Sequence, residues 1–154
     1  MSESAPRRRA RAASPSFAYV IGRVDQGVRR EMRRRLEPFG LSVPEFTTLS
    51  ILHAVPGLSN AQLARRSLIT PPAMLEVLAM LERRGLVERH ADPEHGRIRR
   101  ADLTEEGTRT LRASVRAIER LSDELLADVP ENDRETVHRG LVTVMDRLAS
   151  GLEE

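Results

Sequence analysis

Three helix starts lie close together between residues 42 and 72, and they restrict the possible folds more than any other feature. In LSVPEF, Ser42 can cap a helix while Glu45 bonds back to it, and in LSNAQL the pair Ser59 and Gln62 repeats this arrangement. In ITPPAM, Thr70 is placed to cap and a proline takes the first helical position. The sequence therefore predicts three short helices, at residues 43–54, 60–66 and 71–84.

A β-hairpin is predicted directly after the third helix. Gly85 is placed to end that helix, and the segments LVERH, ADPEHG and RIRRADL are typical of a strand, a turn-rich loop and a second strand. Arg99 and Arg100 interrupt the apolar alternation of the second strand, so its bounds follow only loosely from the pattern. Two short helices joined by the turn RSLI and followed by a hairpin predict a winged helix-turn-helix, a mainly α fold with a small β-hairpin wing.

Longer helices are predicted on both sides of this unit. Apolar residues recur on one face over residues 17–36, up to the helix-ending EPFG, and over 111–129, up to the helix-breaking Pro130. Asn132 is placed to cap a last helix. Its apolar stripe consists of Val137, Leu141, Val144, Leu148 and Leu152. These stripes offer more apolar surface than one small core needs, so a helical dimerisation region is favoured over the alternative of an intramolecular bundle.

Charge is distributed unevenly along the chain. All 25 basic residues are arginine, and the formal net charge is only +2. Arginine outnumbers Asp and Glu by 10 to 3 over residues 1–35, equals them at 8 to 8 over 36–102, and is outnumbered 7 to 12 over 103–154. Such asymmetry fits a molecule that turns one face toward a polyanion, and it fits an ordinary solvated surface almost as well.

A winged helix-turn-helix binds double-stranded DNA with fixed parts. The second helix enters the major groove, the first braces it across the backbone, and the hairpin reaches the neighbouring groove or backbone. Arginines on the wing and the bracing helix are therefore candidate phosphate or base contacts, although Arg65 and Arg66 suit a solvated surface equally well. The candidate DNA-binding residues are Arg65, Arg66, Thr70, Pro71, Pro72, Ala73, Leu75, Glu76, Arg97, Arg99 and Arg100.

The hairpin loop also raises the alternative of a metal site. His90, Asp92, Glu94 and His95 are residue types that bind divalent cations. A hairpin tip is flexible and solvated, however, and four nearby arginines oppose a cation there. We therefore expect no metal, and a plain solvated turn is the other alternative to a DNA-binding wing.

Composition narrows the remaining functions. The 154 residues are the size of one domain, and the absence of cysteine excludes thiol redox chemistry and thiolate metal sites. No apolar run approaches the roughly 20 residues of a membrane span, so we expect a cytoplasmic protein without a membrane partner. No glycine-rich phosphate loop follows a strand, and Ser42 and Ser59 are explained as caps, so neither an enzyme nor a cofactor is expected.

The patterns divide the chain into four segments. The first, 1–15, contains RRRAR, lacks an apolar period and is typical of a disordered basic arm, which could follow DNA or stay solvated. We expect an N-terminal dimerisation helix at 16–42, the winged helix-turn-helix DNA-binding domain at 43–103, and C-terminal dimerisation helices at 104–154.

The pieces QLARR, LERRGLVER, DPEHGR and LTEEG occur in this order within residues 41–107. In this order and spacing they resemble the MarR family of bacterial transcription regulators, and the flanking helices extend the likeness over nearly the whole chain after the arm. The resemblance implies a homodimer that binds a roughly palindromic operator, most often as a repressor. It also implies a small-molecule pocket between the dimerisation helices and the DNA-binding lobes.

Two features depart from the family pattern. The family's wing commonly has a second Asp where this chain has His95, and because that Asp would steer the wing arginine, the orientation of Arg97 does not follow from the resemblance. The start of the second helix offers few donors to base edges, with Thr70 as the exception and Glu76 as an acceptor for cytosine. We therefore expect phosphate contacts and groove shape to carry much of the affinity.

These features lead to one main hypothesis and one alternative. The main hypothesis is a regulator released from its operator by an aromatic or phenolic effector. The scarce aromatic and polar groups near such a pocket, each also suited to an ordinary core, are Phe17, Tyr19, Phe46 and His53. The alternative, suggested by the donor-poor helix, is a winged-helix protein-interaction module or nonspecific architectural DNA-binding module without a specific operator.

Overall fold

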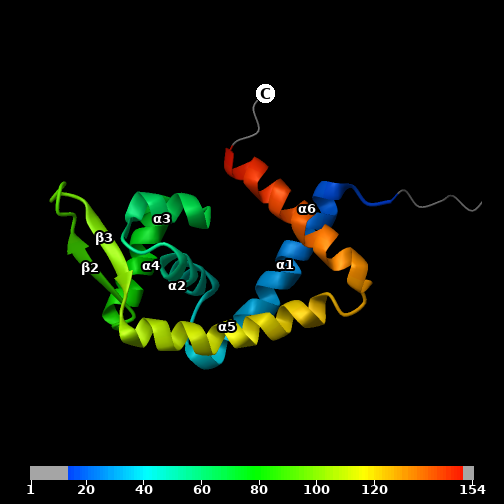
Figure 1. Ribbon diagram of the computed structural model, residues 1–154, viewed down its shortest axis with the longest axis horizontal. Coiled ribbons are helices and arrows are strands. Elements are labelled where there is room, and N and C mark those ends of the chain that lie inside the picture. The colour runs from blue at the N-terminus through cyan, green and yellow to red at the C-terminus, as the bar shows by residue number, and fades with distance from the viewer. Residues whose placement is uncertain (1–13, 151–154) are drawn as a thin grey trace, which may run out of the picture.

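The chain is mainly helical, with a small sheet at one end. The computed structural model describes residues 14–150, so Leu152 and nearly all of the predicted basic arm at 1–15 lie outside the described residues. The elements are α1 (Phe17–Leu36), η1 (Glu37–Phe39), α2 (Val43–Ala54), β1 (Leu58–Ser59), α3 (Asn60–Ser67), α4 (Pro71–Arg83), β2 (Val87–Ala91), β3 (Arg99–Leu103), α5 (Glu105–Leu125) and α6 (Glu131–Ser150). Figure 1 shows the short helices and the sheet gathered at one end, with the long α5 leading away toward α1 and α6. Within this part of the chain no helix is both long enough and apolar enough to cross a bilayer.

The three predicted helix starts are confirmed by their hydrogen bonds. The Ser42 hydroxyl accepts from the Glu45 amide at 3.3 Å, and the Glu45 carboxylate accepts from the Ser42 amide at 2.7 Å. Ser59 and Gln62 form the same reciprocal pair at the start of α3, and the Thr70 hydroxyl accepts from the amide three residues later. Because each cap is a local pattern, it fixes the start of its helix without help from the rest of the fold.

The wing is a three-stranded antiparallel sheet with the order β1-β3-β2. β2 and β3 pair with Val87 opposite Leu103 and Ala91 opposite Arg99, which confirms the predicted hairpin. The sequence pattern does not predict β1, whose two residues pair with the other edge of β3. A two-residue strand has no period of its own, and it is defined only by the partner strand beside it.

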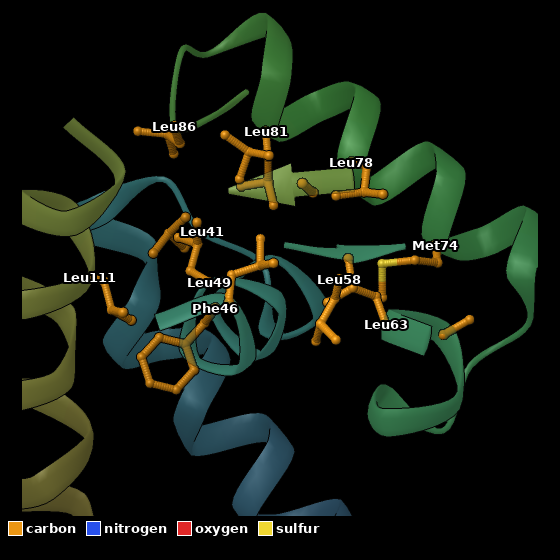
Figure 2. Close-up of a cluster of buried hydrophobic side chains, with 14 of the residues drawn as sticks. Leu41, Phe46, Leu49, Leu58, Leu63, Met74, Leu78, Leu81, Leu86 and Leu111 are labelled. Carbon is orange, nitrogen blue, oxygen red and sulfur yellow. The ribbon is translucent and has the colours of Figure 1, made fainter. Parts of the chain in front are cut away.

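A leucine-rich core determines which face of α4 stays free. Figure 2 shows side chains of α2, α3 and α4 directed toward one another, with Leu111 of α5 beside them. Met74 and Leu78 of α4 are fully buried, whereas Leu75 and Glu76 are exposed. Met74 and Leu78 are four residues apart and therefore lie on the same face of α4. Because that face is buried, Leu75 and Glu76, which lie on other faces of the helix, are turned toward solvent.

The junction between α5 and α6 differs from the prediction. α5 ends at Leu125 rather than at Val129, because the chain closes in turns there and a residue before proline is disfavoured in helical conformation. α6 begins at Glu131, ahead of the predicted cap Asn132. That cap is wrong, because the carbonyl of Pro130 accepts from the Asp133 amide at 2.8 Å and already starts the helix.

Helices α1 and α6 bury little apolar surface within one chain. Leu36 is the one buried residue of α1, and α6 has none. An ion pair at 2.5 Å between Arg35 and Glu124 ties the end of α1 to α5, and this bond lowers the pKa of the Glu124 carboxyl. The exposed apolar residues of α1 and α6 are Phe17, Tyr19, Val20, Val24, Val137, Leu141, Met145 and Leu148. An intramolecular bundle would cover these stripes, and the described chain leaves them open.

Candidate nucleic-acid interface

The first turns of α4 present most of the predicted contact residues to solvent. Pro71, Pro72, Leu75 and Glu76 are exposed, and Ala73 is half-buried. The Thr70 hydroxyl caps the helix and remains exposed, so its own proton is free to be donated. This surface is mainly apolar, with one hydroxyl and one carboxylate as its polar groups.

Asn60, which the sequence pattern does not single out, holds the start of α4 against α3. Its Nδ2 donates to the carbonyl of Pro71 at 3.1 Å. Asn60 is the first residue of α3 and Pro71 the first of α4, so the bond joins the two helices at their N-terminal ends. An asparagine beside a capping serine is ordinary in sequence, and only the packing of the two helices reveals its role.

Three of the predicted arginines are free to bind a ligand. Arg65 and Arg66 lie exposed in the last turn of α3, and Arg97 is exposed on the wing. None of the three guanidinium groups makes a hydrogen bond or ion pair with another residue in the range 14–150. Unpaired guanidinium groups are well suited to phosphate oxygens and guanine edges.

A groove of about 380 Å³ connects α4 with the wing. Its lining includes Leu75 of α4, Arg97 and Arg99 of the wing, and residues at the start of α3. The fold thus places the exposed face of α4 next to wing residues that are distant in sequence. This arrangement is what a winged helix-turn-helix needs in order to contact adjacent parts of one duplex.

The three wing arginines are not equivalent. Arg99 is exposed, although its Nη2 donates to the carbonyl of Arg89 at 2.7 Å. Arg100 is half-buried and is bonded to the carboxylate of Asp92 and, at 2.8 Å, to the carbonyl of Gly57. Arg97 alone among the three has a guanidinium without a bond to any described residue.

Asp92, predicted only as a metal alternative, organises the wing turn instead. Its carboxylate accepts from the amides of Glu94 and His95 at 2.8 and 2.9 Å, and these bonds, together with Arg100, hold its pKa below the usual range. Within residues 14–150, no three His, Asp or Glu side chains gather in a geometry that could hold a metal ion. The signal that could have indicated this role is the Asp-Pro turn itself, since aspartate often accepts from amides two residues ahead.

The four predicted pocket residues are not brought together by the fold. Phe17 and Tyr19 are exposed near the start of α1, Phe46 is buried in the core, and His53 faces a shallow depression beside α5. A different crevice, of about 290 Å³, lies between α1, α2 and the end of α3. Residues lining this crevice include Arg29, Met32, Val43, Thr47, Arg66 and Ile69.

Comparison with known proteins identifies the family. The sequence profile described as the MarR family matches residues 39–98. The HTH-type transcriptional repressor Rv2887 of Mycobacterium tuberculosis is 43% identical over 107 residues, which are 70% of this chain and 76% of the relative. The chain belongs to the MarR family. It is a MarR-type transcription regulator with a winged helix-turn-helix, and regulators of this family are not enzymes.

Solved MarR structures agree with the fold. The crystal structure of Rv2887 with salicylic acid has a TM-score of 0.72 and 34% identity, and the match covers 86% of this chain and 98% of that one. The structure of Rv2887 with DNA has the same TM-score and 32% identity, with coverage of 85% and 98%. The mainly helical winged fold predicted from the sequence is therefore confirmed, including the flanking helices.

Arg97 provides a first test of the wing. We expect Arg97→Ala to weaken duplex binding by about tenfold and to reduce the slope of log affinity against log salt by about one, because one phosphate contact is lost. Fluorescence anisotropy titrations at several salt concentrations measure both quantities. The matched control is Arg109→Ala, which removes an exposed arginine that Glu106 holds on α5. Equal behaviour of the two variants would show that the wing does not touch DNA.

Proposed function

We propose that the chain is a homodimeric MarR-type repressor that binds a pseudo-palindromic operator in double-stranded DNA and is released by a small molecule. The observation that carries this proposal is the groove that joins the exposed face of α4 to Arg97 of the wing. Arg65 and Arg66 at the end of α3 supply further cations for the adjacent backbone. The protein acts in the cytoplasm, where bacterial operators are located.

Dimerisation would use α1, α5 and α6, which correspond to segments 16–42 and 104–154. The support is the uncovered apolar surface of α1 and α6, where Val137, Leu141 and Leu148 are each more than two fifths exposed. Leaving large apolar side chains in water is unfavourable by roughly 25 cal/mol for each Å². A second copy of the same stripe would remove this surface from water, with two-fold symmetry as the ordinary arrangement.

Operator recognition would depend on the spacing of two α4 helices. Successive major grooves on one side of a duplex are about 34 to 36 Å apart, so both helices enter together only when the dimer holds them at that distance. Direct reading of bases would be limited to Thr70 and Glu76, with apolar contacts from Ala73 and Leu75 to thymine methyl groups. Phosphate contacts and the shape of the groove would supply the remaining affinity.

The effector would bind in the crevice between α1, α2 and α3. Its lining combines apolar Met32, Val43 and Ile69 with the guanidinium groups of Arg29 and Arg66, which suits an aromatic ring that carries a carboxylate. Rv2887, the similar protein, has been solved with salicylic acid and with p-aminosalicylic acid. A ligand wedged there would separate α1 from the winged region and so change the spacing of the two α4 helices.

Arg29 provides the test of this crevice. Arg29→Ala should weaken salicylate binding on the order of tenfold, because it removes a cation and leaves Asp25, now bonded to Arg29 at 2.8 Å, free to repel a carboxylate. Isothermal titration calorimetry gives the affinity. Arg23→Ala removes another exposed arginine of α1 that does not line the crevice, and it serves as the control. Identical salicylate affinity in both variants would place the effector elsewhere.

Specificity for DNA separates the proposal from its alternative. A repressor should prefer one palindrome over random duplex by on the order of 10³ or more at physiological salt. An architectural module would show the same steep salt dependence without the preference. The experiment is selection of bound sequences from a random duplex pool, followed by titration of the recovered palindrome and of random duplex at matched salt. Equal affinity for both would reject the operator.

A further inference from the structure

The guanidinium group of Arg100 bonds to two separate turns beside the wing sheet. It lies on the central strand β3, opposite His90 of β2 and opposite Ser59 of β1. Its Nε donates to the carboxylate of Asp92 in the wing turn, and its Nη1 donates to the carbonyl of Gly57 at 2.8 Å. One side chain therefore links the wing turn to the turn between α2 and β1.

Gly57 is held by residues of β3 through both its amide and its carbonyl. Its amide is within 2.7 Å of the carboxylate of Asp102, which accepts from it, and its carbonyl accepts from Arg100. The residue has a φ of +70°, a conformation that favours glycine, so the turn offers a backbone carbonyl at a fixed place. The α2–β1 turn is thus a rigid anchor for whatever Arg100 holds.

Asp92 provides the other anchor. It is only 5% exposed, and the amides of Glu94 and His95 fix the orientation of its carboxylate before Arg100 is considered. A charged pair of this kind is stronger than a neutral hydrogen bond and is worth most where water is excluded. The bond between Asp92 and Arg100 therefore adds a side-chain link between the wing turn and β3 to the backbone bond from the Asp92 amide to the Ile98 carbonyl at 2.8 Å.

We propose that Arg100 is a positioning residue that braces the wing through Asp92 and Gly57 and so holds Arg97 in place, rather than a residue that binds DNA. This inference rests on the proposed function, because it explains how Arg97 is aimed at a duplex. It also bears on His95, which stands where the family pattern has an acid that would steer the wing arginine. In this chain the orientation comes instead from a bond across the sheet.

The competing possibility is that Arg100 leaves Asp92 and binds a phosphate. The two possibilities predict opposite signs for Asp92→Asn. If Arg100 bound phosphate, the change would free its guanidinium and remove a negative charge near DNA, so the affinity would stay the same or rise. If Arg100 is a brace, the affinity falls, because the wing turn is no longer held by a charged partner.

The experiment compares Asp92→Asn with Glu94→Gln. Both remove one negative charge from the same loop, but the Glu94 side chain makes no bond with any residue in the range 14–150. Asparagine keeps an acceptor for the two turn amides, so Asp92→Asn preserves the turn and weakens mainly the bond to Arg100. On a duplex of fixed arbitrary sequence and on the palindrome recovered by selection, we expect Asp92→Asn to raise Kd by about tenfold and Glu94→Gln to leave it unchanged or lower it.

A second readout does not depend on DNA. In ¹⁵N NMR spectra of the free protein, the Nε proton of Arg100 should exchange slowly with water, and this signal should be lost in Asp92→Asn while exchange of the wing-turn amides at 92–98 becomes faster. If the amides of strands β2 and β3 still exchange slowly with water, the variant is folded. Arg100→Ala also removes the bond to the Gly57 carbonyl, so it should weaken duplex binding at least as much as Asp92→Asn. The double variant should be no weaker than Arg100→Ala, because both changes break the bond between Asp92 and Arg100.

Two results would overturn the brace. The first is the pattern of a phosphate contact: Asp92→Asn binds the duplex as tightly as the unchanged protein or more tightly, and Arg100→Ala reduces the slope of log affinity against log salt by about one. The other is a rapidly exchanging Arg100 Nε proton in the unchanged protein. If the protein prefers no palindrome, the operator proposal fails, and the NMR comparison still decides whether Arg100 holds the wing.

Discussion

Replacing both Leu141 and Met145 by aspartate should convert the protein to a monomer and lower its affinity for the palindrome on the order of 10³-fold. Both side chains are about half exposed on α6, and each lies on the apolar stripe that we assign to the dimer interface. A buried carboxylate without a partner is strongly unfavourable, so two in each protomer would prevent association. Sedimentation equilibrium at micromolar concentration gives the mass, and anisotropy gives the affinity.

The matched control adds the same charge to the opposite side of α6. Thr143→Asp with Ser150→Asp introduces two carboxylates at exposed positions away from the stripe, and it should leave the dimer intact. Both double variants should retain the thermal stability of the winged region, because no residue of α6 is buried within one chain. A dimer that survives Leu141→Asp with Met145→Asp would show that α6 is not part of the interface.

Gly107→Ala should destabilise the fold by about 3 kcal/mol, the upper end of what an extra methyl group in a tight core normally costs. A Cβ at this position would lie 2.0 Å from the carbonyl oxygen of Leu86 and 3.0 Å from its carbonyl carbon. These are backbone atoms, and the same carbonyl accepts from the Thr104 amide at 3.1 Å, so neither side can move freely. Urea denaturation monitored by circular dichroism measures the loss.

The control for this prediction is Gly96→Ala in the wing loop. No heavy atom lies within 4 Å of a Cβ built there, so the free energy of unfolding should change by no more than about 0.5 kcal/mol. Equal stability of the Gly107 and Gly96 variants would mean that α5 does not approach the backbone of Leu86, between α4 and β2, as closely as described. The structure would then not explain why position 107, the last residue of LTEEG, is a glycine.

The sequence was most informative where structure is determined locally. The caps at Ser42, Ser59 and Thr70 set the starts of α2, α3 and α4 because each involves residues only three apart. β1 could not be predicted, since its two residues become a strand only by pairing with β3, which lies some forty residues later in the chain. The junction after α5 was misplaced because turn formation before Pro130 outweighed the apolar period.

In the candidate site, too, features determined by local sequence could be predicted and those that depend on distant residues could not. The exposed face of α4 could be predicted from helical periodicity, because burial of Met74 and Leu78 leaves Leu75 and Glu76 outside. The bonds of Arg100 could not be predicted from the sequence, since its two partners are brought to it by the sheet and by the α2–β1 turn. The four residues chosen for their scarcity as pocket candidates remain a prediction, and within one chain Phe17 and Tyr19 lie exposed near the start of α1.

The geometry of two helices on one duplex can be measured directly by hydroxyl-radical footprinting of the protein on the palindrome recovered by selection. A dimer that places both α4 helices in one duplex should give two protected clusters, related by the dyad of the sequence, with centres about 10 to 10.5 base pairs apart or a whole multiple of that spacing. Both clusters should disappear together in Leu141→Asp with Met145→Asp. A single protected tract, or two clusters on opposite sides of the duplex, would contradict the dimer geometry.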